Sequence, residues 1–434
     1  MTETIDKISS LPDDILTHIL SFLRTREAVQ TCILSKRWRN TWASVPVLNF
    51  HVSDYDENKR WKFDQFVNGV LKNRGPVLLD TIISSRDVKN RYIEPPPIGW
   101  LHRATLLMPR VISVDIPYCY GLYPDLDFPD SVFSCASLEK LELFYFSDSG
   151  PPYLIQNSIA LASLKTLVLY YLSLNDDFVQ KLLLGCPVLE NLKLWRCDLE
   201  ISDISSNVLK EFTLDYCQHF QPMRICCPGL VSLSIISSMD TIGFIWLENM
   251  ASLVNASINF SGRYCYEYNV DDHDRPNSKI FSGLSDVTNL ELYFWLLPEL
   301  KLKELWKDIS NCKTFYNLKN LDFGAWNMVK DFSLVACFLE HCPVVKQLTL
   351  RLSERPGIIN AARRDVPFQR EYLEKVNILC EEDEELDSKL VGVLGGHVKT
   401  IGNINIRYTS YFVIDKLHGD GYRRCAETRR FLAC

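Results

Sequence analysis

Apolar residues near the start of the chain recur with the period of a one-sided helix. Leucine and isoleucine lie three or four positions apart over residues 11–23, and Pro12 followed by two aspartates is typical of a helix start. The pattern predicts a helix here, a second short helix at 27–32 and a third at 34–42. Three helices within about 40 residues bury too little apolar surface to be stable alone, so this unit is expected to need a partner surface.

A second pattern begins near residue 110 and consists of L-x-x-L-x-L triplets that start 20 to 34 residues apart. This spacing overlaps the leucine-rich-repeat period and somewhat exceeds it. The triplets are Val111/Val114/Ile116, Leu138/Leu141/Leu143, Leu164/Leu167/Leu169, Leu189/Leu192/Leu194, Leu209/Phe212/Leu214, Leu230/Leu233/Ile235, Leu253/Ala256/Ile258, Val287/Leu290/Leu292, Leu318/Leu321/Phe323, Val345/Leu348/Leu350, Leu373/Val376/Ile378 and Ile401/Ile404/Ile406.

Each triplet predicts a short strand whose apolar residues face a continuous core, followed by a return segment that is often helical. Helical returns are expected at 177–184, 302–309, 331–340 and 384–394. Two units extend to L-x-x-L-x-L-x-x-C, which would place Cys197 and Cys217 in the turn after the strand. The predicted fold class is α/β: a three-helix module, then a solenoid with parallel strands on its concave face and helices on its convex face.

The segment between the two patterns is less regular. Residues 61–71 have helical spacing, 77–83 form a short apolar run consistent with a strand, and three prolines at 95–97 mark a loop before a helical stretch near Trp100. The domain boundaries predicted on this basis are 6–50 for the helical module, 51–105 for a connector, 106–407 for the repeats and 408–434 for a C-terminal tail.

The N-terminal module resembles an F-box, the motif that docks a substrate receptor onto a Skp-type adaptor in a cullin ubiquitin ligase. The resemblance rests on LPDDIL from Leu11, on LSKRWR from Leu34 and on Trp42, in that order. Two positions depart from the family pattern: Arg24 stands where many members have proline, and Cys32 where serine is usual. With the repeats included, the chain resembles the plant F-box proteins with leucine-rich repeats.

The resemblance implies an adaptor-binding surface on the helical module, and the apolar residues there have two readings. They either form an internal helical core or contact the adaptor, and the small size of the module favours contact. The residues implied in adaptor binding are Leu11, Pro12, Ile15, Leu16, Ile19, Leu20, Leu23, Leu34, Ser35, Lys36, Trp38 and Trp42.

Composition bounds the partners. The 434 residues carry a formal net charge of −7, with 23% charged and 47% hydrophobic residues, so the chain is globular and lacks the basic excess of a general nucleic-acid binder. No apolar run reaches 18 residues and the first residues lack a signal-peptide pattern, so we expect no membrane association and a location in the nucleus, the cytoplasm or both. The 15 cysteines are then expected to remain thiols.

No catalytic or metal-binding constellation is evident. There is no C-x-x-C pair, and His341 with Cys337 and Cys342 is explained by the end of a helix. The acidic run 271–274 is expected to be a solvated loop, and the glycines at 392–396 lack phosphate-loop spacing. We therefore expect no enzyme activity, no cofactor and no metal.

A binding surface is expected on the concave face of the repeats, because the residues between the strand leucines project there. Aromatic side chains among charges are typical of recognition surfaces, although they can equally cover the edges of repeats. The candidates for target binding are Phe144, Tyr170, Trp195, Asp215, Tyr293 and Arg351.

The resemblance therefore implies a non-catalytic substrate receptor. The F-box would bind a Skp-type adaptor, and through it cullin and RING-box subunits, while the repeats hold a target protein for ubiquitination by proximity. Two alternatives remain open at this stage: a small-molecule sensor of the hormone-receptor kind, and an adaptor-bound scaffold that ubiquitinates nothing.

Overall fold

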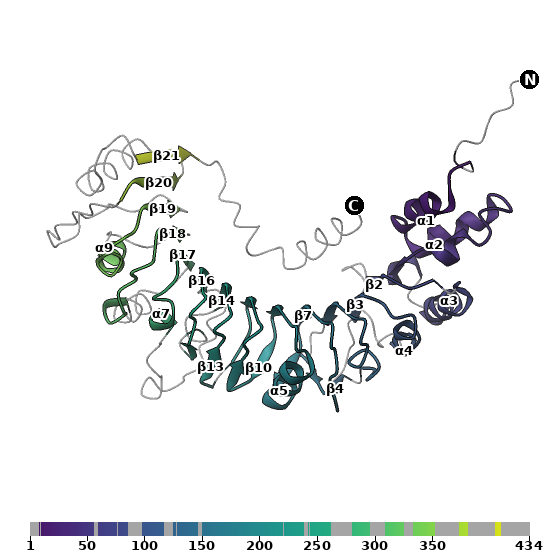
Figure 1. The fold of residues 1–434 in the computed structure, drawn as a ribbon, viewed down its shortest axis with the longest axis horizontal. Helices are drawn as coiled ribbons and strands as arrows, with labels where there is room; N and C mark the ends of the chain where they lie inside the picture. The colour runs from purple at the N-terminus through teal and green to yellow at the C-terminus, as the bar shows by residue number, and fades with distance from the viewer. Residues whose placement is uncertain are drawn as a thin grey trace, which may run out of the picture. The chain divides into compact units, whose positions relative to one another are not determined.

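A computed structural model describes residues 8, 10–55, 60–75, 77–85, 98–116, 125–126, 128–145, 150–219, 221–237, 242, 244–261, 280–295, 309–324, 333–351, 373–380 and 404–408. The chain divides after Leu189 into two compact units. Figure 1 labels helices and strands of both. The predicted helix at 384–394, the predicted helix at 302–309 except its last residue, the loop at 95–97, the acidic run 271–274 and nearly all of the tail lie outside the described residues.

Unit 1 begins with the helical module. It contains α1 (Asp13–Ser21), α2 (Thr25–Gln30) and two 3-10 helices, η1 (Thr31–Ile33) and η2 (Thr41–Ser44). The first two helices confirm the prediction, but residues 34–42 form turns and part of η2 instead of a third α-helix. This run carries few apolar residues on any one helical face, and only its Trp38 is buried in the module.

The large sheet of unit 1 starts earlier than the triplets predicted. Its parallel strands follow the order β1 (Val47–His51), β2 (Thr81–Ser85), β3 (Val111–Ile116), β5 (Lys140–Tyr145) and β7 (Thr166–Tyr170). The predicted connector therefore supplies a strand of this sheet, and the F-box segment supplies another. The helices α3 (Arg60–Asn73) and α4 (Trp100–Thr105) confirm the helical runs predicted between them.

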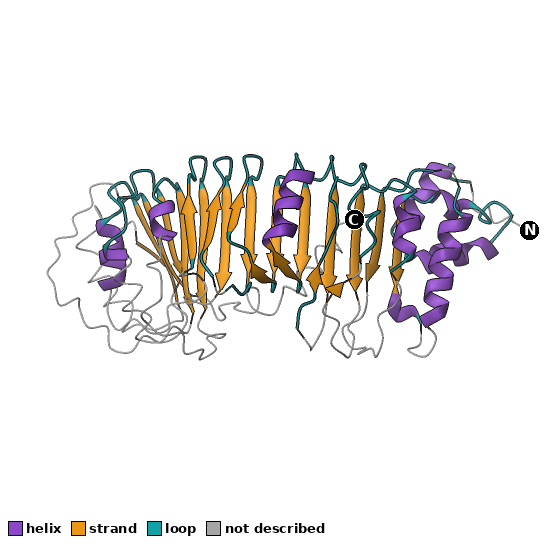
Figure 2. Cartoon of the chain, turned by 90° about the horizontal axis from the view of Figure 1, so that it is seen from below, coloured by secondary structure: helices purple, strands orange, loops and turns teal. Residues whose placement is uncertain are grey.

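Unit 2 continues the same repeat. The strands of its large sheet, all parallel, are β9 (Asn191–Trp195), β12 (Glu211–Asp215), β14 (Ser232–Ser237), β16 (Asn255–Ser261), β17 (Asn289–Trp295), β18 (Asn320–Gly324), β19 (Gln347–Arg351), β20 (Lys375–Cys380) and β21 (Ile404–Tyr408). Within each unit the strands lie side by side and point the same way (Figure 2).

The register of the strands follows the apolar triplets. Leu141 and Leu143 of β5 pair with Leu167 and Leu169 of β7, and all four side chains are fully buried. The first triplet is the exception, because Val114 pairs with Leu143 and not with Leu141. The prediction from Val111 was therefore shifted by two residues, since every second position in this strand is apolar and the period alone does not fix the register.

The return segments are mixed. Helices α5 (Asp176–Gly185) and α9 (Ser333–Glu340) confirm two predicted returns, and α7 (Ile280–Gly283) adds a short one. Other returns are short parallel strands, which the apolar pattern did not predict. These are β4 (Asp125–Leu126), β6 (Tyr153–Leu154) and β8 (Ser173–Asn175) in unit 1, and β10 (Asp198–Glu200), β11 (Asp203–Ser205), β13 (Met223–Cys226) and β15 (Ile245–Glu248) in unit 2.

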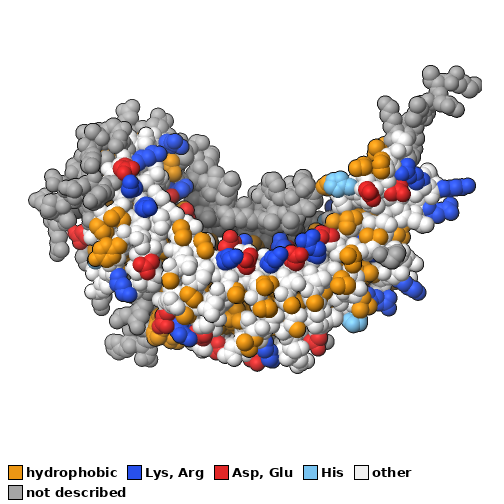
Figure 3. Space-filling view, viewed as in Figure 1, with side chains coloured by type: hydrophobic (Ala, Val, Ile, Leu, Met, Phe, Trp, Pro, Cys, Tyr) orange, Lys and Arg blue, Asp and Glu red, His pale blue; other side chains and the backbone are white. Residues whose placement is uncertain are grey.

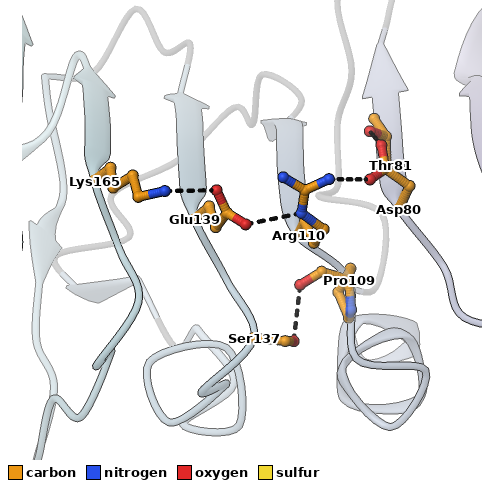
Figure 4. A network of polar contacts seen from close by, with 7 residues as sticks. All are labelled: Asp80, Thr81, Pro109, Arg110, Ser137, Glu139 and Lys165. Atoms are coloured by element: carbon orange, nitrogen blue, oxygen red, sulfur yellow. Dashed lines mark hydrogen bonds and ion pairs between the residues drawn. The ribbon is translucent and has the colours of Figure 1, made fainter.

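A line of charged residues stands just before successive strands of unit 1 (Figure 4). Arg110 lies between two acids, with Nη1 3.1 Å from Asp80 Oδ1 and Nε 2.8 Å from Glu139 Oε1, and Glu139 also pairs with Lys165 at 3.1 Å. The carbonyl oxygen of Arg110 accepts the backbone N–H groups of Glu139 and Lys140. Alternating charge and shared backbone hydrogen bonds thus hold neighbouring repeats in register.

The two extended repeats end as predicted. Cys197 and Cys217 are buried in the turns after β9 and β12, each preceded by a residue with φ of 51°, and Cys217 Sγ donates to the carbonyl oxygen of Leu194 at 3.2 Å. All the cysteines whose state is described are free thiols. Among the residues that the structure describes, no helix is long and apolar enough to span a membrane. No group of three or more potential metal-ligating side chains comes together there either.

Candidate adaptor-binding and target-binding surfaces

Three residues expected to contact an adaptor form the interior of the helical module. Leu16, Leu20 and Trp38 are exposed by 0%, 1% and 6%, and they pack with Ala28 and Val45. This corrects the expectation that they lie at the surface. The bulky Trp38 side chain fills the space that short helices leave open, so it supports the module from inside.

Three further candidates line this core from its edge. Leu11, Leu23 and Trp42 are partly buried and pack against it. Arg37 ties the LSKRWR segment to the start of α1, because its Nη2 donates to the carbonyl oxygen of Leu11 and to Asp13 Oδ1 at 2.8 Å. Arg37 therefore has a structural role in joining the two halves of the module.

The other candidates are at the surface, and so are two large apolar residues that the sequence analysis did not select. Ile15, Ile19 and Leu34 are exposed by 45%, 40% and 65%, and Phe22 and Ile33 by 46% and 83%. We call these five residues the apolar tip. Figure 3 shows hydrophobic side chains reaching the surface of this N-terminal module.

Available signals pointed to the two missed residues. Phe22 continues the helical spacing of Ile15 and Ile19 on α1, and Ile33 directly precedes Leu34. The remaining candidates, Pro12, Ser35 and Lys36, are also exposed. The module thus separates into an interior, which contains Trp38, and a surface on which the apolar tip is exposed among polar and charged residues.

A second set of contacts fixes the module to the first strand of the sheet. Arg24 Nη1 lies 2.7 Å from Asp54 Oδ1, and the backbone N–H of Asn49 donates to Thr25 Oγ1 at 2.6 Å. Arg26 donates to the carbonyl oxygen of Asp54 and stacks over the Tyr55 ring at 5.2 Å. We call Arg24, Thr25 and Arg26, which lie at the start of α2, the clamp.

The large sheet has one face toward the return segments and one face away from them, which we call the open face. In unit 1 the expected aromatics of the open face are not exposed: Phe144 and Tyr170 retain 3% and 8% of their accessible surface, with ring centroids 6.1 Å apart. The expectation of exposed aromatic side chains is therefore wrong at these two positions. The apolar pattern of the sequence did not predict the exposed fraction of side chains on the open face.

In unit 2 the expected residues are more accessible. Trp195, Asp215, Tyr293 and Arg351 are each partly exposed. Arg351 binds Asp322 on the neighbouring strand through Nε, 3.1 Å from both carboxylate oxygens, and through Nη2, 2.8 Å from Oδ2. The hydrogen bonds to Asp322 raise the pKa of Arg351, so the Arg351 guanidinium stays charged.

Tyr293 belongs to the same cluster. Burial raises the pKa of its hydroxyl, and the nearby carboxylates of Asp322 and Glu291 add to the rise while Arg351 opposes it. The ring therefore stays neutral at physiological pH. The structure brings Tyr293 and Arg351 together on one face, whereas Trp195 and Asp215 pair with each other on β9 and β12.

The fold and these surfaces define a leucine-rich-repeat protein with an F-box at its N-terminus. The F-box domain model matches residues 8–50, and the LRR-repeat model of the FBD-associated F-box protein At5g56370 matches residues 110–258.

Similar proteins of Arabidopsis thaliana extend this match. The F-box/FBD/LRR-repeat protein At4g00160 is 31% identical over 77% of this chain and 78% of its own length. The F-box/LRR-repeat protein 13 is 28% identical over 81% and 77%, and the putative FBD-associated F-box protein At5g56440 is 29% identical over 80% and 74%. The chain belongs to the F-box/LRR-repeat family.

Proposed function

We propose that this protein is the substrate-recognition subunit of an SCF-type ubiquitin ligase. F-box domains generally bind Skp-type adaptors, and F-box/LRR-repeat proteins generally act as non-catalytic receptors. In this proposal the apolar tip binds the adaptor, which connects to cullin and RING-box subunits, and the open face of the repeats binds the target.

The observation that carries the proposal is the apolar tip. Its five large side chains are 40% to 83% exposed on a module with its own closed core, so much of their apolar surface is open to a partner. Burying a fully exposed side chain of this size is worth about 1.5–3 kcal/mol, and covering the part that is still exposed is worth a corresponding fraction of that. An apolar group of this kind at a protein surface is typical of an interaction site.

The mechanism is proximity. The receptor makes and breaks no covalent bond in this proposal; it raises the concentration of target lysines around a ubiquitin-charged enzyme. The repeat sheet is suited to this task because its strands present successive rows of side chains on one face.

The test measures binding of the full chain to a purified Skp-type adaptor. Ile19→Asp and Leu34→Asp are expected to weaken binding at least tenfold, because each places a charge in the interface. Leu106→Asp is the matched control: Leu106 is 71% exposed in the same unit but lies outside the tip, so binding should be unchanged.

Two outcomes oppose the proposal. If Ile19→Asp and Leu34→Asp bind the adaptor as well as the unmodified chain does, the apolar tip is not the adaptor site. If the adaptor binds but a cullin–RING-box complex is not recovered with it, the protein is a scaffold and not a ligase receptor.

A further inference from the structure

We propose that a cluster on the open face of unit 2 binds an arginine side chain of the target protein. The cluster, which we call the Tyr293 patch, consists of Asn259, Glu291, Tyr293, Asp322 and Arg351. This inference rests on the proposed function, because it names the chemical group that the repeats recognise.

The strand register places the patch on one face. Glu291 and Tyr293 alternate along β17 with Leu290 and Leu292, which are buried against the return segments. Their side chains therefore point to the open face. Across the sheet, Asn259 of β16 pairs with Tyr293, and Asp322 of β18 pairs with Glu291.

A glycine gives the tyrosine ring its position. The neighbour of Tyr293 on β18 is Gly324, and a Cβ atom built there would lie 2.0 Å from Tyr293 Cδ1. The ring therefore occupies the space that any other side chain at position 324 would fill. One side of the ring packs on the β18 backbone, and the partial exposure of Tyr293 leaves aromatic surface available to a ligand.

The carboxylates beside the ring have different roles. Arg351 donates hydrogen bonds to the Asp322 carboxylate from both Nε and Nη2, and this bidentate contact fixes the position of Asp322. Glu291 is exposed and makes no ion pair with any described residue. The cluster therefore carries two formal negative charges and one positive charge. Arg351 forms its ion pair with Asp322 and lies within electrostatic reach of Glu291, so the cluster as a whole has an excess of negative charge.

Asn259 supplies an independent reason to expect a donor at this place. Its side chain is 97% buried, and its Oδ1 accepts no hydrogen bond from the parts of the chain that the structure describes. An amide oxygen that is buried without a donor costs about 1–3 kcal/mol of folding free energy. A ligand that turns this side chain outward and donates a hydrogen bond to its Oδ1 would remove that cost.

An arginine fits these features better than a lysine does. Its guanidinium is flat and stacks on an aromatic ring, and its five N–H groups can serve several acceptor oxygens at once. A lysine ammonium is a compact charge with three donors and stacks less well. A negatively charged ligand is disfavoured by Glu291.

The experiment uses the full chain in complex with its adaptor and arrays of random-sequence peptides. One position of each peptide is fixed as arginine, lysine, citrulline or glutamate. Arginine peptides are expected to be retained about tenfold better than citrulline peptides, which keep the shape but lose the charge. Glu291→Gln should remove most of this preference.

Glu211→Gln is the matched control. Glu211 is also exposed on the open face of unit 2, on β12, and this change removes the same charge away from the patch. The arginine preference should survive it. A second variant, Gly324→Ala, displaces the Tyr293 ring and should lower arginine retention without changing any charge.

The outcomes separate the two proposals. If the chain binds its adaptor but shows no arginine preference, or keeps that preference in Glu291→Gln, the Tyr293 patch is not an arginine site and the receptor role stands. If lysine peptides are retained as well as arginine peptides, the commitment to a guanidinium is wrong. Loss of adaptor binding in the unmodified chain would instead remove the receptor role.

Discussion

Arg24 and Asp54 join the F-box module to the first strand of the repeat sheet. The Arg24 side chain reaches from the start of α2 to η3 (Val52–Asp54), which follows β1, and its Nη1 lies 2.7 Å from Asp54 Oδ1. Thr25 and Arg26 make the other contacts of the clamp. Position 24 is where many F-box sequences have proline, which has no side chain able to form this ion pair.

The contacts of the clamp are expected to contribute unequally to stability. Arg24 is 45% exposed, so its ion pair contributes no more than about 1 kcal/mol. Thr25 is buried and accepts the Asn49 N–H, so Thr25→Val should cost about 1–3 kcal/mol by leaving that donor without a partner. Amide hydrogen exchange measures this directly, because exchange at Asn49 should accelerate in Thr25→Val and change little in Arg24→Ala.

Thr17→Val provides the control for this comparison. Thr17 Oγ1 also takes part in a local hydrogen bond, to the Asp14 carbonyl, but it does not contact β1. Exchange at Asn49 should be unaffected. Equal protection of Asn49 in Thr25→Val and in the unmodified chain would show that the threonine does not hold the module to the strand.

Trp38 and Leu34 are expected to differ in the kind of damage that their loss causes. Trp38→Ala removes a buried ring from the core of the module and should cost about 3–5 kcal/mol of stability. Leu34→Ala removes an exposed side chain and should leave stability within about 0.5 kcal/mol. Urea unfolding measures the free energy of unfolding of each variant. It is followed by circular dichroism for both variants and also by tryptophan fluorescence for Leu34→Ala.

This pair also shows where sequence analysis succeeded and where it stopped. Helical spacing located α1 and α2, because apolar periodicity records which face is buried. It did not separate Trp38, which is buried, from Leu34, which is exposed, since both are large and apolar. The difference in burial depends on the turns and the part of η2 that residues 34–42 form. Apolar periodicity does not predict these backbone conformations.

The repeats show the same division. Triplets from Leu138 onward fixed the strand register because every repeat offers the same spacing to its neighbours. The burial of Phe144 and Tyr170 and the placement of the Tyr293 ring over Gly324 depend on contacts across strands, which a single repeat does not contain. The arrangement of the patch could therefore be found only from the structure.

The thiol of Cys186 is expected to be inert in the folded protein. The residue is fully buried, and burial raises the pKa of this thiol to about 12 while a backbone hydrogen bond to Leu161 opposes the shift. Alkylation with iodoacetamide at about pH 9 should leave Cys186 unlabelled until the chain is unfolded in urea, because the thiolate is the reactive form. Mass spectrometry of the digested protein measures the labelled fraction.

The same shift predicts a pH dependence. The folded state keeps the proton of Cys186 while the unfolded state releases it above about pH 9, so the unfolded state binds fewer protons and stability falls as pH rises from 9 towards 12. The contribution is fully present below pH 9. Cys186→Ala should flatten this alkaline slope, and an unchanged slope would show that other groups cause it.

Glu139 is expected to be an unusually strong acid. Hydrogen bonds from Arg110 and then Lys165 hold the pKa of its carboxyl at about 2, against an ordinary value of 4.5. The folded state therefore releases this proton more readily than the unfolded state does. The resulting stability is present above about pH 4.5 and is lost as pH falls towards 2.

A titration of the Glu139 side-chain carboxyl by NMR measures this pKa. Arg110→Gln removes the larger of the two hydrogen-bonding contributions and should raise the pKa of Glu139 more than Lys165→Gln does. Arg103→Gln is the control, because Arg103 is an exposed cation on α4 of the same unit. High salt should also raise the pKa, since these pairs are near the surface and are screened. A pKa of Glu139 that stays near 2 in Arg110→Gln would mean that the ion pair with Arg110 does not lower this pKa.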